Sequence, residues 1–126
     1  MLRHWKTIAT RGKMEKDIIV LNLLVGWEII HLSKSGKKVS VRLREFPDNH
    51  SRFFRITFSK CSLAVILDFA HMQTEDFSNF NFKGCIFSQI NMENDQMIGI
   101  HLIKQSKLVG ALKIISDEIN YDFTTK

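Results

Sequence analysis

Histidine, cysteine and carboxylate side chains build most catalytic and metal centres, and this chain scatters them. No two histidines share an HxH or HExxH spacing, so the sequence does not bring two of them to one metal ion. The two cysteines, Cys61 and Cys85, each lie beside apolar residues, which favours buried thiols over a disulfide framework. The histidines are His4, His31, His50, His71 and His101.

Two acidic pairs, Glu75-Asp76 and Glu93/Asp95, could in principle supply a general acid and a general base. Both pairs lie in polar, turn-like segments, where solvated carboxylates are usual. The chain contains no GxSxG, CxxC, GxxxxGK[ST] or GxGxxG motif. The sequence therefore predicts a protein that is not an enzyme, with no catalytic residue, no metal and no cofactor.

The basic charge of the chain is concentrated in its first half. The formal net charge is +5, made up of +8 for residues 1–60 and −3 for residues 61–126. A basic half suits attraction to phosphate or to an acidic protein surface, and it is also what an ordinary solvated face looks like.

Four of these cations are predicted to share one surface. Lys38, Arg42 and Arg44 alternate with apolar residues, so they project from the polar face of a strand. Arg55 projects in the same way from the next predicted strand. If the two strands pair, the four side chains form one patch, which we predict to be the partner-binding site.

The elements that must position this patch are mostly strands. Alternation of apolar and polar residues predicts a mainly β (α+β) fold, an antiparallel β-sandwich or curved sheet of about seven to eight strands with one or two helices packed on it. Strands are expected from residue 27 to a hairpin turn at 34–37, then over 39–43, 54–58, 63–69, 86–90, 97–103 and 119–123, with turns at 47–49, 59–62, 93–95 and 116–117.

Other segments stay open at this stage. Residues 17–25 and 108–115 fit either a helix or a strand, and residues 1–14 fit a basic N-terminal helix or arm. A length of 126 residues suits a single domain over 1–126.

One aromatic spacing resembles pentapeptide-repeat sequence. Phe77, Phe82, Phe87 and Met92 recur every five residues, but the pattern covers too little of the chain for stacked coils to bury a core. We interpret it as two strands whose Phe residues fall at that spacing.

No apolar run approaches the roughly twenty residues of a membrane span. Acidic residues Glu15 and Asp17 interrupt the basic start of a signal peptide, so we expect a cytoplasmic protein without membrane contact. A mitochondrial presequence over residues 1–14 is the alternative, because that segment has no acidic residue.

The element order over residues 26–69 resembles that of small bacterial toxin-immunity proteins of the polymorphic-toxin or contact-dependent-inhibition type. The residues concerned are Gly26-Trp27, the Ser35-Gly36 hairpin, the strand over 39–43, Arg55–Phe58 and Leu63–Phe69. The resemblance implies a non-catalytic protein whose partner is a cognate toxin domain, bound tightly and neutralised by direct contact. The alternative function is a nucleic-acid-binding domain that uses the basic N-terminal half.

Overall fold

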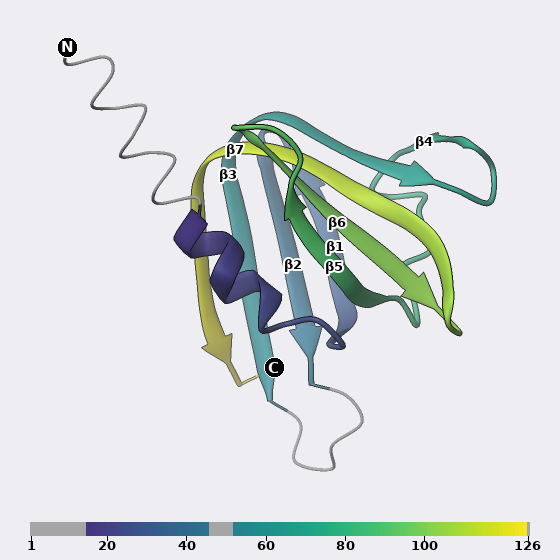
Figure 1. The fold of residues 1–126 in the computed structure, drawn as a ribbon, viewed down its shortest axis with the longest axis horizontal. Coiled ribbons are helices and arrows are strands. Elements are labelled where there is room, and N and C mark those ends of the chain that lie inside the picture. The colour runs from purple at the N-terminus through teal and green to yellow at the C-terminus, as the bar shows by residue number, and fades with distance from the viewer. Residues whose placement is uncertain (1–14, 46–51, 126) are drawn as a thin grey trace.

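Strands with one apolar face make up most of the chain. The computed structural model describes residues 15–45 and 52–125. They form one seven-stranded antiparallel sheet and one helix, which confirms the predicted mainly β fold with a curved sheet (Figure 1). The strands are β1 (Glu28–Ser35), β2 (Lys38–Arg44), β3 (Phe53–Asp68), β4 (Gln73–Glu75), β5 (Ile86–Met92), β6 (Met97–Lys104) and β7 (Lys107–Thr124).

The sheet curves until its strands close on themselves. The strand order is β2-β1-β5-β6-β7-β3-β4, and β2 also pairs with β3. The seam between β1 and β5 is short, with one residue pair, Glu28 with Ile86. Apolar side chains of alternate positions fill the inside, and among the fully buried ones are Val41, Ile56, Phe58 and Phe87.

Two long bent strands, β3 and β7, carry the fold. They pair along almost their whole length, with a register shift between Cys61 and Leu63. Just before the shift, Lys60 adopts a φ of +53°, and the Ser116 hydroxyl donates to the Ser59 carbonyl oxygen (2.6 Å). The turns predicted at 59–62 and 116–117 are therefore wrong: these polar residues bend the two strands at a bulge instead of reversing the chain.

The two segments that the sequence left between helix and strand, 17–25 and 108–115, differ in the structure. Residues 15–22 form a helix that ends in a turn at Gly26, where φ is +94°, and the buried side chains of Leu21 and Leu24 attach it to the core. Residues 108–115 are strand, because they pair with both β6 and β3. Gly110 marks close packing there, since a Cβ at this position would lie 2.6 Å from the Leu67 carbonyl oxygen.

The aromatic spacing is not two strands. Phe77 and Phe80 lie buried in turns before β5, and of the recurring residues only Phe87 and Met92 lie in a strand, β5. Phe77 and Phe80 are buried because the connection between β4 and β5 closes over the core, and sequence spacing does not distinguish such a connection from a strand. The predicted arm at 1–14 and the turn at 47–49 lie outside the described residues.

Candidate partner-binding face

The pairing of β2 with β3 brings the four predicted cations together. Arg42 lies directly opposite Arg55, and Arg44 lies opposite Phe53 at the end of the ladder. The alternate residues of β2 and of the first half of β3 are buried, so Lys38, Arg42, Arg44 and Arg55 all project from the outer surface of the sheet. We call these four side chains the basic face.

Arg44 differs from the other three cations. Its guanidinium donates to the Glu28 carboxylate of the neighbouring strand β1 at 2.5 Å, and the pair is partly shielded from water. Within residues 15–45 and 52–125, Lys38, Arg42 and Arg55 make no ion pair. Three positive charges of the basic face are therefore available to an external group.

The basic face continues onto β7 as a shallow hollow. Arg55 lies opposite Asp122, and Thr57 lies opposite Asn120. The hollow has a volume of about 530 Å³ and is lined by Lys38, Ser40, Arg55, Thr57, Asn120, Tyr121 and Asp122. Beside the single Asp122 carboxylate, the two cations, the hydroxyls and the amide of this hollow can bind carboxylates or phosphates by charge and by hydrogen bonds.

A second basic hollow adjoins the first at Lys38. It has a volume of about 430 Å³ and adds Lys37 and Lys60, together with Ser62 and Asp117. Sequence reasoning missed Lys37 and Lys60 because both were assigned to turns, where the alternation of a strand does not predict the direction of a side chain. Their positive charge was the only signal available.

The titratable groups elsewhere serve local structure. His71 Nδ1 lies 2.7 Å from the Asp68 carboxylate, whose other oxygen accepts the Ala70 amide at 3.0 Å in the turn after β3. The hydrogen bond between His71 and Asp68 is the main reason why the pKa of His71 is raised and the pKa of Asp68 is lowered. Burial raises the pKa of the Cys61 and Cys85 thiols, which disfavours the reactive thiolate.

Some of the acidic residues that the sequence offered as a possible acid and base have local partners. Glu93 forms an ion pair with Lys113, and the Glu75 carboxylate accepts the Asp76 amide at 3.1 Å. No group of three or more histidine, cysteine or carboxylate side chains is placed to hold a metal ion in the part of the chain that the structure describes.

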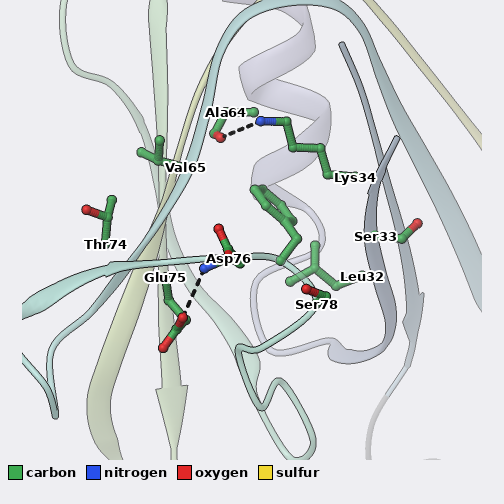
Figure 2. A pocket seen from close by; sticks show the side chains of 10 residues that line it. Leu32, Ser33, Lys34, Ala64, Val65, Thr74, Glu75, Asp76 and Ser78 are labelled. Atoms are coloured by element: carbon green, nitrogen blue, oxygen red, sulfur yellow. Dashed lines mark hydrogen bonds between the residues drawn. The ribbon is translucent and has the colours of Figure 1, made fainter. Parts of the chain in front are cut away.

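A groove of about 610 Å³ lies between β1 and the β3–β4 pair (Figure 2). Lys34 reaches across it from β1, and its ammonium donates to the Ala64 carbonyl oxygen at 3.4 Å. The same ammonium lies 6.0 Å from the centre of the Phe77 ring. Glu75 and Asp76 line the opposite wall. Sequence reasoning missed this groove, because Lys34 was assigned to the hairpin turn and β4 was not predicted.

No protein-family model, curated protein or solved structure matches this chain. Among the described residues, no helix has the length and apolar character needed to cross a membrane. The function is therefore inferred from the geometry of the basic face and of the groove.

Proposed function

We propose that this protein is an immunity-type protein of the cytoplasm, which binds a cognate toxin domain and neutralises it by direct contact, without catalysis. The resemblance of residues 26–69 to toxin-immunity proteins suggests the class. The register that sets Arg42 beside Arg55 is the observation that supports the docking surface.

The physical case for docking rests on rigidity and charge. The paired strands β2 and β3 hold the backbone of these residues in place, so binding orders less of the backbone than binding through a loop does. Unpaired cations attract an acidic patch and raise the association rate, and arginine is a frequent interface anchor. We therefore expect the partner to present carboxylates to Lys38, Arg42 and Arg55, while Arg44 stays paired with Glu28.

The test is co-expression with the product of the adjacent open reading frame, which this proposal predicts to be the toxin. The wild type should restore growth and form a complex of equal stoichiometry, measured by light scattering after gel filtration. Failure to restore growth and to form a complex would contradict the immunity-type function.

The surface is tested separately by reversing charge. Arg42→Glu with Arg55→Glu should keep the unfolding temperature within a few degrees, because Arg55 is exposed, Arg42 is only half-buried, and surface substitutions usually change stability by about 0.5 kcal/mol or less. The association rate at low salt should fall at least tenfold. The control is Lys83→Glu with Lys107→Glu, an equal charge change at exposed residues away from β2 and β3. An unchanged rate in the first variant would move docking to the acidic loops at Glu75-Asp76 and Glu93-Asp95.

The two adjoining hollows also support nucleic-acid binding as the second candidate function. Lys37, Lys38 and Lys60 stand beside the hydroxyls of Ser40 and Ser62, and these are side chains that contact phosphate oxygens. Affinity for RNA or DNA would then fall steeply as salt increases. A gel shift with mixed RNA and DNA at low salt should show a complex; its absence there would exclude this function.

A further inference from the structure

Two strand edges border the groove without pairing to each other. β1 pairs with β5 only at Glu28, and the Ile29 amide donates to the Cys85 carbonyl oxygen at 2.9 Å; beyond Ile29, that edge of β1 has no neighbouring strand among the described residues. On the other side, β2 pairs with β3 up to Phe58, and β4 pairs with β3 from Ile66 onward. Around Ala64, β3 pairs with β7 on one edge, and its other edge has no partner strand among the described residues.

The alternation of the β1–β2 ladder shows which backbone groups face the groove. A two-residue turn joins Ser35 to Lys38, so Ser35 and Lys38 exchange backbone hydrogen bonds. Along an antiparallel ladder every second residue pair is hydrogen-bonded in this way. The amides and carbonyls of the residues between, Leu32 and Lys34, point away from β2 and into the groove. Ala64 points its carbonyl into the groove from β3, where it meets the Lys34 ammonium.

β4 turns away before it can fill this space. The Asp76 carbonyl oxygen accepts the amides of Asn79 and Phe80, both at 3.0 Å, and Phe77 is buried beneath the groove. The edge of β1 at Leu32 and Lys34 thus keeps backbone groups for one added strand.

Charge indicates what the added strand carries. Lys34 occupies an inward-facing position of β1 and already has the Ala64 carbonyl and the Phe77 ring as neighbours. Glu75 and Asp76 on the other wall form no ion pair with a described residue. The groove is lined by one cation and two carboxylates, a net charge of −1, which favours a basic side chain on the guest.

We propose that this groove binds an extended basic segment of a partner protein, added as a strand beside the free edge of β1. Backbone amides and carbonyls of the segment pair with those of Leu32 and Lys34, and a lysine or arginine of the segment meets Glu75 and Asp76. The proposal does not depend on the basic face, which would repel such a segment.

Hydrogen exchange of the free protein gives the first test. The amides of Leu32 and Lys34 should exchange much faster than those of His31 and Ser33, which are bonded to β2. Equal protection of all four amides would mean that the edge is already satisfied and would overturn the proposal.

Peptide binding gives the second test. The probe is a fluorescein-labelled heptapeptide of alternating valine and lysine, compared with the same peptide N-methylated at alternate residues. The unmodified peptide should bind and protect the Leu32 and Lys34 amides, and N-methylation should weaken binding at least tenfold. No binding, or equal binding of both peptides, would overturn the proposal.

Two variants separate the acidic wall from general attraction to carboxylates. Glu75→Gln with Asp76→Asn should weaken the lysine peptide severalfold, whereas the control Asp117→Asn with Asp122→Asn should not. Arg42→Glu with Arg55→Glu should retain peptide binding, so failure of this proposal and failure of the proposed function are distinguishable. Weakening only in the control variant would place the peptide elsewhere and overturn the proposal.

Discussion

Asp68 and His71 form an ion pair that fastens the turn between β3 and β4. A histidine whose pKa is raised by folding contributes stability below about pH 6.5, and loses it as pH rises through the folded pKa. A carboxyl whose pKa is lowered contributes stability above about pH 3.8, and loses it as pH falls through the folded pKa. Both contributions are complete only between about pH 3.8 and about pH 6.5, and one of them fades on either side.

We therefore predict that His71→Gln destabilises the protein mainly between about pH 4 and 6.5, with a smaller effect at pH 9. Urea unfolding of both proteins from pH 3 to 9 measures the difference. His31→Gln is the control, because His31 hydrogen-bonds Ser33 rather than a carboxylate. A difference that does not change with pH would mean that the ion pair contributes nothing.

Two glycines show how local contacts decide the cost of one methyl group. A Cβ at Gly110 would meet the backbone oxygen of Leu67, whereas a Cβ at Gly99 would meet the end of the Glu93 side chain. Gly110→Ala should cost about 1–3 kcal/mol, because the strand backbone must shift. Gly99→Ala should cost less and should displace Glu93 from Lys113. Chemical denaturation compares the two; a smaller cost at Gly110 would contradict the prediction.

For single residues, the sequence predicted which cations point outward only where apolar and polar residues alternate regularly along a strand. Arg42 and Arg55 follow from parity, because Val41 and Ile56 flank them on regular strands. Lys60 does not, because its positive φ interrupts the period of two. The pairing of Arg44 with Glu28 could not be predicted either, since it depends on the register between β1 and β2.

The helix is the element whose attachment depends most on one polar contact. The Tyr121 hydroxyl donates to the Asp17 carboxylate at 3.0 Å, and Asp17 is only 4% exposed. Burial and the neighbouring carboxylate both raise the pKa of Tyr121. The contact joins the helix of residues 15–22 to the end of β7.

Tyr121→Phe should lower the free energy of unfolding by about 1–3 kcal/mol, because it leaves a buried carboxylate without its donor. Asp17→Ala should cost less in the Tyr121→Phe background than in the wild type. A double-mutant cycle by urea unfolding measures this coupling. Additive effects would show that the hydrogen bond does not attach the helix.

At the scale of elements, regular alternation was sufficient to predict β2 and the first half of β3. It failed where one strand bends, because Ser, Lys and Asp are common both in turns and at bulges. It also failed for 108–115, where helical spacing of the apolar residues competed with strand pairing. Only the contact of Gly110 with β3 and the pairing on both sides of β7 settle that segment as strand.

For the molecule as a whole, the seam between β1 and β5 is the weak line of the closed sheet. Besides one residue pair, it is held by backbone hydrogen bonds of Gly26, Ile29 and Phe87. By contrast, β3 and β7 pair from Phe53 to Asp68. Local opening should therefore begin at the seam.

Native-state hydrogen exchange in low denaturant tests this expectation. The amides of Gly26, Ile29 and Phe87 should exchange with a lower free energy than amides in the β3–β7 ladder, which should open only on global unfolding. Equal free energies at both places would mean that the sheet opens as one unit.

The place of β7 in the sheet also has a consequence for synthesis. β7 lies between β6 and β3, although it comes last in sequence among the seven strands of the described residues. A ribosome therefore produces β3 well before residues 107–124, and in that interval the β3 edge that β7 later covers carries unpaired backbone groups. Nascent chains with such an edge associate readily with one another. We expect newly made chains to need a holding chaperone until β7 emerges, and crowded translation to lower the yield of native protein.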